Sequence, residues 1–219
     1  MKKKDFEWTK NIEIPLTCVY NKELFPNKRS KIDTIDEYLE KWVNDYINDF
    51  NNRIVIRVGK EMKTKVDPVL INTFNKFLNQ TKIPTQKAVE SHRFGMQIEN
   101  LIGDLVEQYI DSKSDITHWS YCWGKCVKSV DFCDESNFLL QVKNRSNTEN
   151  SSSDKVREGT TIVKWFRISA NTNKTYWDDL NQKIGKSDLF SEVEFQKYAD
   201  SMFDKNPKLI YLKSYNNIL

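Results

Sequence analysis

The stretch Val130–Asn144, VDFCDESNFLLQVKN, predicts two short strands joined by a polar turn. Asp131 lies in the first strand, and Gln141 and Lys143 lie in the second. Because successive strand residues point to opposite faces, Gln141 and Lys143 share one face. An acid on one strand, beside a polar residue and a lysine on the next, can hold a divalent metal next to a phosphodiester. A site of this kind is our leading hypothesis.

The composition indicates a globular chain. Of the 219 residues, 38% are hydrophobic, 30% are charged and 12% are aromatic, which is enough to build one sizeable domain with a core. No apolar run reaches the roughly 18 residues that a transmembrane helix needs. The basic start, MKKKDFEWTK, is not followed by the apolar segment of a signal peptide. A cytoplasmic location is therefore the expectation.

The cysteines do not follow a zinc-binding pattern. Cys122, Cys126 and Cys133 are spaced C-x3-C-x6-C, and Cys18 is remote. Structural zinc sites usually use paired C-x2-C or C-x4-C units, and this spacing matches neither. Buried free thiols in a reducing compartment are the better interpretation.

Positive charge is concentrated in one part of the chain. The net charge is only +3, but residues 139–176 contain seven Lys or Arg against three Asp or Glu. A basic surplus directly after the candidate metal site suits a polyanion. The alternative is an ordinary solvated helix face.

The first part of the chain is predicted to be mainly helical. Residues 1–33 have few periodic signals and are expected to be loop. Thr34 and Glu37 form a capping box before a helix of about four turns, and Asp67-Pro68 begins a second helix. We expect a helical subdomain over residues 1–90 and the main domain over 91–219, with a recognition loop at 144–157.

A long helix is predicted over Ser91–Asp111. Gly95 and Gly103 lie in its interior, where each costs about 1 kcal/mol relative to alanine, so a close neighbour is expected. Glu107, one turn after Gly103, can reach toward a partner strand. The alternative is a glutamate that faces solvent.

Three strands with short connections are expected after this helix, which suits antiparallel neighbours. Two helices and a last strand should follow. The predicted ranges are Ile116–Gly124, Cys126–Cys133 and Asn137–Asn144 for the strands, Asp154–Ser169 and Ser191–Asp204 for the helices, and Pro207–Tyr215 for the last strand.

Three segments resemble the SinI-type family of type II restriction endonucleases, which belongs to the PD-(D/E)XK nuclease superfamily. They are ENLIGDLVEQYI, WSYCWGKCVKSVDFC and LLQVKNRSNTENSSSDKVREGTTIVKWFRI. The resemblance implies an α+β fold, with a central mixed sheet flanked by helices. It also implies a Mg²⁺-dependent homodimer that cuts double-stranded DNA at GGWCC (W is A or T) and leaves 5′-phosphate ends. Such an enzyme acts beside a DNA methyltransferase that protects the host.

The resemblance assigns the motif acid to Asp131 and the motif lysine to Lys143. Gln141 stands where the pattern more often has Asp or Glu, and an amide cannot supply an anionic ligand. Glu107 therefore gains importance as the second acid. The backbone carbonyl of Val142, between Gln141 and Lys143, is a further candidate ligand for Mg²⁺, which prefers oxygen.

The loop after the lysine is the candidate for reading DNA. Arg, Asn, Glu and Ser side chains can hydrogen-bond base edges, and Lys and Arg can contact phosphates. The candidates for base or nearby contacts are Asn144, Arg145, Asn147, Glu149, Asn150, Ser152 and Arg157, and those for phosphates are Lys155, Lys164 and Arg167.

Two other functions stay open at this point. Gln141 is compatible with a non-cleaving DNA-binding module of nuclease descent. A nuclease directed by DNA structure or modification is the third possibility.

Overall fold

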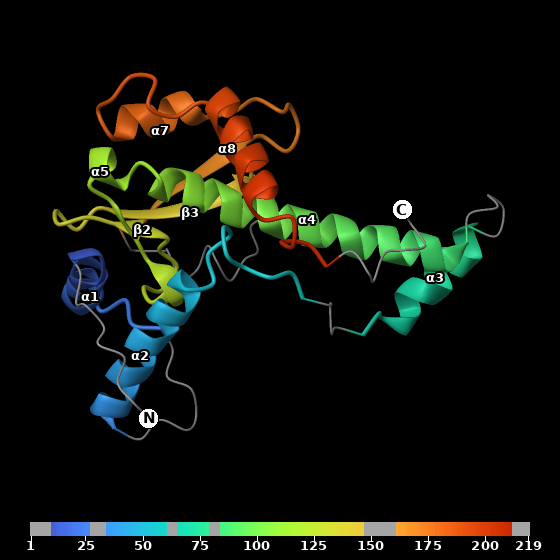
Figure 1. Ribbon diagram of the computed structural model, residues 1–219, viewed down its shortest axis with the longest axis horizontal. Coiled ribbons are helices and arrows are strands. Elements are labelled where there is room, and N and C mark those ends of the chain that lie inside the picture. Colours follow the sequence, from blue (N-terminus) through green and yellow to red (C-terminus); the bar gives the residue numbers. More distant parts are fainter. Residues whose placement is uncertain (1–9, 27–33, 61–64, 79–83, 147–160, 212–219) are drawn as a thin grey trace.

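The computed structural model describes residues 10–26, 34–60, 65–78, 84–146 and 161–211. Within these ranges helices surround a four-stranded sheet (Figure 1). The helices are α1 (Lys10–Lys22), α2 (Ile35–Phe50), α3 (Pro68–Leu78), α4 (Thr85–Asp111), α5 (Ser114–Thr117), the short 3₁₀ turn η1 (Trp123–Lys125), α7 (Trp177–Lys183) and α8 (Glu192–Lys205). The strands are β1 (Ser120–Tyr121), β2 (Phe132–Cys133), β3 (Leu139–Arg145) and β4 (Val163–Ile168).

The sheet is mixed and has the order β1-β2-β3-β4. The first two pairings are antiparallel, with Tyr121 opposite Phe132 and Phe132 opposite Leu140. The β3–β4 pairing is parallel, with Val142 opposite Trp165. The predicted α+β class with a central mixed sheet is confirmed.

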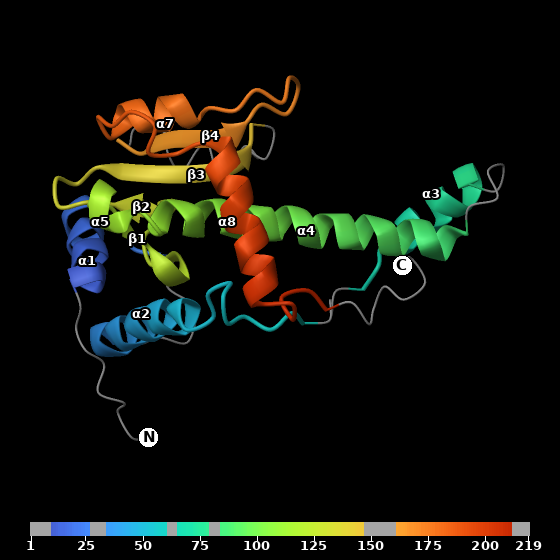
Figure 2. The same cartoon turned by 45° about the horizontal axis from the view of Figure 1, so that its top comes forward.

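Helix α4 is the longest element and joins two parts of the molecule. Its C-terminal half is buried through Leu101, Leu105, Val106 and Ile110, among others. Its N-terminal half extends beyond the sheet beside α3, which has no buried residue (Figures 1 and 2). The predicted helix is confirmed but begins earlier, at Thr85. Gly95 and Gly103 have open space where a Cβ would lie, so the expected close neighbour is absent at both positions.

Helix α2 follows the predicted start. Thr34 accepts a hydrogen bond from the Glu37 backbone N–H, and the Glu37 carboxylate accepts one from the Thr34 N–H. Trp42 and Tyr46 form its buried stripe. This capping box satisfies two of the free N–H groups at the helix start.

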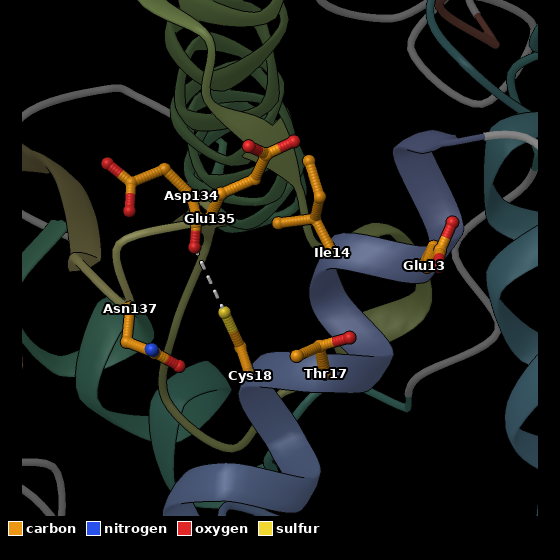
Figure 3. Close-up of a pocket in the computed structure, with 7 residues that line it drawn as sticks. All are labelled: Glu13, Ile14, Thr17, Cys18, Asp134, Glu135 and Asn137. Atoms are coloured by element: carbon orange, nitrogen blue, oxygen red, sulfur yellow. Dashed lines mark hydrogen bonds between the residues drawn. The ribbon is translucent and has the colours of Figure 1, made fainter.

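Residues 10–22 form helix α1, so the expectation of a loop was wrong there. Ile12, Cys18 and Val19 are buried at a spacing close to two helical turns, and this stripe outweighs the proline inside the helix. The Cys18 Sγ donates to the Asp134 carbonyl at 3.4 Å, which ties α1 to the turn between β2 and β3 (Figure 3).

The expectation of a helix over Asp154–Ser169 was also wrong where the structure describes it. Val163–Ile168 is a strand, in which Trp165 and Arg167 are buried at the two-residue period of a sheet. Its parallel pairing with β3 satisfies its backbone. The β-branched residues before Trp165 favour this outcome.

The other expected strands are shorter or absent in the described ranges. The pairing of β1 and β2 covers two residues each, because the chain between them is occupied by η1 and bends. Residues 207–211 form turns rather than the start of a last strand. Helix α8 is confirmed within one residue of the prediction.

The core draws on helices from both ends of the described chain and on the sheet, but not on α3. Ile12 of α1, Trp42 of α2 and Leu105 of α4 belong to the same cluster as the sheet residues. The division into a subdomain and a main domain at residue 90 stays a prediction. No described helix combines the length and apolar character needed to cross a membrane.

Candidate active site

A cleft of about 450 Å³ is lined by α4, by β1 and η1, and by β3. It brings together residues that are far apart in the sequence. Its charged lining residues are Asp49, Arg57, Glu99, Asp104, Glu107, Lys125, Asp131 and Lys143. Three of the four predicted catalytic residues therefore meet in one place.

Asp131 is fixed by hydrogen bonds on both sides. It directly precedes β2, and its backbone N–H donates to the Leu140 carbonyl at 2.8 Å. Its carbonyl accepts from the Cys122 N–H at 2.8 Å. Its carboxylate Oδ2 accepts from the Val142 N–H at 2.7 Å, so the side chain reaches across to β3.

Val142 presents its backbone to the same place. The Val142 N–H points toward Asp131, and the N–H and C=O of one strand residue face the same side. The Val142 carbonyl is therefore directed to the Asp131 side of β3, beyond the end of β2. This is the orientation that the predicted ligand role requires.

Glu107 reaches the cleft from the C-terminal half of α4. The Tyr121 hydroxyl of β1 donates to its carboxylate Oε2. This bond joins the helix to the sheet and fixes which way the carboxylate points. The alternative of a glutamate that faces solvent does not hold in this structure.

Glu107 and Asp131 repel each other. Burial and then the charge of Asp131 raise the pKa of Glu107 well above its usual range, while the Tyr121 hydrogen bond and Lys143 oppose this shift. Burial also raises the pKa of Asp131, against the Val142 hydrogen bond and the charges of Lys143 and Lys125. Two desolvated carboxylates close together favour a cation between them.

These residues fit a hard divalent cation. Two carboxylates and a backbone carbonyl are oxygen donors, and Mg²⁺ commonly combines one or two carboxylates with water. In the part of the chain that the structure describes, no group of three or more His, Cys, Asp or Glu is arranged to hold a metal.

Lys143 and Gln141 have different surroundings. Lys143 lines the cleft, but Gln141 is not among the described residues that line it and is only 5% exposed. Of these two residues, only Lys143 lines the cleft. Gln141 lies further into β3, where the strand is covered on both faces.

Some predicted DNA contacts are placed by the structure. Asn144 lines the cleft, Arg145 is partly exposed at the end of β3, and Lys164 is exposed on β4. The other predicted recognition residues fall outside the described residues. They are Asn147, Glu149, Asn150, Ser152, Lys155 and Arg157.

Arg167 does not lie where a phosphate contact requires it. It is 8% exposed, and its guanidinium donates to Asn144 Oδ1 at 2.9 Å and to Glu192 Oε1 at 2.5 Å. It also lies over the Phe195 ring. Its role in this structure is to join β4 to the start of α8 and to hold Asn144 at the cleft.

A second cavity, of about 430 Å³, lies between α1 and the turn after β2 (Figure 3). Glu13, Asp134 and Glu135 line it, with no lysine or arginine among its described lining residues. This charge would repel a phosphate backbone. The cleft at Asp131, by contrast, has Lys125, Lys143 and Arg57 among its lining residues.

The sequence did not indicate every residue of the cleft. Tyr121 lies within the predicted strand Ile116–Gly124, and the sequence does not indicate its hydrogen bond to Glu107. Asp104 lies one turn before Glu107 and pairs with Arg57. Lys125 lies between the predicted strands Ile116–Gly124 and Cys126–Cys133, and the sequence gives it no role at the site.

Comparison with known proteins assigns the family. The model of the SinI restriction endonuclease family matches residues 28–205. The type II restriction enzyme Eco47I of Escherichia coli is 40% identical over 147 residues, which are 65% of this chain and 64% of that protein. The type II restriction enzyme SinI of Salmonella infantis is 42% identical over 121 residues, 53% of this chain and 52% of that protein.

The chain thus matches less than two thirds of the length of either relative. The family match nevertheless covers the helices α2 to α8, the whole sheet and every residue of the cleft. The mixed sheet with flanking helices agrees with a restriction-endonuclease-like core. The chain belongs to the SinI restriction endonuclease family.

Proposed function

We propose that this protein is a type II restriction endonuclease that hydrolyses double-stranded DNA at GGWCC with Mg²⁺ and leaves 5′-phosphate ends. The observation that carries the proposal is the cleft in which Glu107 and Asp131 lie beside Lys143. Family membership gives the substrate class. The protein would act in the cytoplasm, beside a methyltransferase that protects the same site.

The carboxylates of Asp131 and Glu107 and the carbonyl of Val142 would hold the metal. When bound, Mg²⁺ supplies Lewis acidity toward a phosphate oxygen and lowers the pKa of water. Tyr121 keeps the Glu107 carboxylate directed into the cleft, and the Val142 N–H does the same for Asp131. Lys143 stabilises the negative charge that develops on the phosphate.

We further propose a homodimer in which each copy cuts one strand. A palindromic site presents the same chemistry on both strands, so a two-fold symmetric pair of clefts matches it. Asn144 and Arg145 would contact the DNA where β3 leaves the cleft.

The first test incubates the purified protein with plasmid DNA and Mg²⁺. Discrete bands support the proposal, and run-off sequencing of the ends gives the site and the stagger. Retarded but intact DNA would instead support a binding module without cleavage. Products formed only from modified or branched DNA would support a nuclease directed by those features.

The second test changes the catalytic residues. Asp131→Ala and Lys143→Ala should lower kcat by about 10²–10³-fold or more and leave DNA binding in place. Lys186→Ala is a matched control, because Lys186 is exposed in the loop before α8, outside the cleft. Full activity in either cleft variant would remove that residue from the mechanism.

A further inference from the structure

The turn η1 places Lys125 in a backbone conformation that lysine disfavours. Gly124 and Lys125 have φ values of 71° and 54°, both in the left-handed region. For a residue with a Cβ this costs about 1–2 kcal/mol, and glycine or asparagine is preferred there. Gly124 has the residue type that its backbone favours, but Lys125 does not.

Helix α2 holds this turn on both sides of the lysine. The Gly124 N–H donates to Asp49 Oδ2 at 2.9 Å. After the lysine, the Cys126 carbonyl accepts from Trp42 Nε1 at 2.7 Å. The unfavourable conformation is thus imposed by packing, as is common at functional sites.

The side chain that this turn presents enters the candidate active site. Lys125 is exposed and lines the same cleft as Asp131 and Lys143. It makes no hydrogen bond or ion pair with another residue in the described ranges. Its charge acts on Asp131 and opposes the rise in the pKa of that carboxyl.

The other two basic residues that line the cleft, Arg57 and Lys143, differ from Lys125 in their surroundings. Arg57 pairs with Asp104 on α4, so its charge is largely met within the protein. Lys143 belongs to the motif and faces the carboxylates. Lys125 lies on a third element, η1, and has no ion pair with another described residue.

We propose that Lys125 is a second phosphate-binding cation of the cleft, which holds a non-bridging oxygen of the DNA backbone beside Asp131. The inference rests on the proposed function and adds a residue outside the family motif. The strained turn fixes the Lys125 backbone relative to α2, so that the side chain starts at the cleft that Lys143 lines from β3.

The test uses Lys125→Asn in the full chain. Asparagine tolerates the left-handed region better than lysine, so this change removes the charge without adding strain. Lys125→Arg keeps the charge, and Lys186→Asn removes a charge outside the cleft. Binding to a short duplex carrying GGWCC is measured by fluorescence anisotropy at several salt concentrations, without divalent metal.

Each phosphate contact contributes about 0.9 to the slope of log K against log salt concentration. Lys125→Asn should therefore reduce the magnitude of this slope by about 0.9, with an unchanged or higher Tm. Lys125→Arg and Lys186→Asn should keep the wild-type slope. If Lys125 only shaped the turn, Lys125→Asn would leave both the affinity for the duplex and the salt slope unchanged.

The outcomes distinguish a failure of the Lys125 role from a failure of the proposed nuclease function. If the wild-type protein cleaves DNA and Lys125→Asn keeps its full slope, the role of Lys125 is overturned and the proposed function stands. If the wild-type protein neither binds nor cleaves duplex DNA, the proposed function fails and the role of Lys125 fails with it.

Discussion

At the scale of single residues, the cleft depends on how two carboxylates are held. Glu107 comes from helix α4 and Asp131 from the residue directly before β2. Each is oriented by one donor from the sheet, the Tyr121 hydroxyl and the Val142 N–H respectively. Their mutual repulsion is a cost that the apoprotein bears. A bound cation would remove this repulsion, because it is attracted to both carboxylates in their charged form. The site would therefore bind the cation more tightly.

Changes at Glu107 should therefore act on the metal. Glu107→Gln removes one negative ligand and should raise the Mg²⁺ concentration for half-maximal cleavage at least about tenfold. Tyr121→Phe frees the carboxylate to turn and should shift this concentration in the same direction by about 10–100-fold. A Mg²⁺ titration of the cleavage rate measures both effects.

Glu40→Gln is the control for this experiment, since Glu40 is exposed on α2. An unchanged Mg²⁺ dependence in Glu107→Gln would show that Glu107 only supports the fold.

A second acid of α4 should affect stability rather than activity. Burial raises the pKa of Asp111 to about 6, and Asp111 ends the helix, where the helix dipole also disfavours a negative charge. The folded state thus binds this proton more tightly than the unfolded state. Protonated Asp111 therefore contributes to the stability of the folded state below about pH 4, and this contribution is lost as the pH rises through about 6.

Asp111→Asn should therefore raise the free energy of unfolding at pH 7 by about 1–3 kcal/mol, with little gain at about pH 4. Urea unfolding at the two pH values measures the difference. Asp200→Asn, at an exposed position of α8, should show no such dependence. An equal gain at both pH values would contradict the assigned cause.

At the scale of elements, η1 shows how packing fixes a local conformation. A Cβ at Gly124 would lie 2.5 Å from the Asp45 carbonyl oxygen of α2. The Trp123 ring of the turn also packs edge-on against Phe50, with centroids 5.6 Å apart. The turn therefore has little freedom to move away from α2.

Gly124→Ala should destabilise the protein by clearly more than the left-handed conformation alone costs, which is about 1–2 kcal/mol. Gly185→Ala is a matched control, because Gly185 has φ 64° but nothing within 4 Å of a new Cβ. The difference in the free energy of unfolding between the two variants isolates the clash with Asp45. Equal values would mean that η1 can shift at no cost.

Elements with a local signal could be predicted from the sequence. The Thr34 capping box and the proline at residue 68 marked helix starts, and both helices are present. β4 was missed because its identity depends on pairing with β3, which is a contact remote in sequence. Helix α1 was not predicted because Pro15 lies inside it and a proline normally argues against a helix.

The candidate site divides in the same way. Asp131 and Lys143 could be placed from strand spacing, and Glu107 from its helix. Tyr121, Asp104 and Lys125 could not, because their roles come from how α4, β1 and η1 meet. Gln141 shares the strand face with Lys143 by count, but the depth of the strand in the core decides that only Lys143 lines the cleft.

At the scale of the whole molecule, one chain offers one described cleft with paired carboxylates and a motif lysine. A single cleft can act on one strand at a time, whereas a type II enzyme has to cut both strands of the duplex. The proposed dimer, with two copies related by a two-fold axis, would solve this, because its symmetry would match that of a palindromic site.

A mixed dimer tests this arrangement directly. Wild-type protein and Lys143→Ala protein, carrying different affinity tags, are coexpressed, and the pair that carries both tags is isolated. This pair has one competent cleft, so it should nick supercoiled plasmid to the open circle and form linear DNA about 10²–10³-fold more slowly than wild type. The wild-type pair purified in the same way should give linear DNA. If the mixed pair linearises the plasmid at the wild-type rate, one cleft is able to cut both strands. The proposal that each copy cuts one strand would then be wrong.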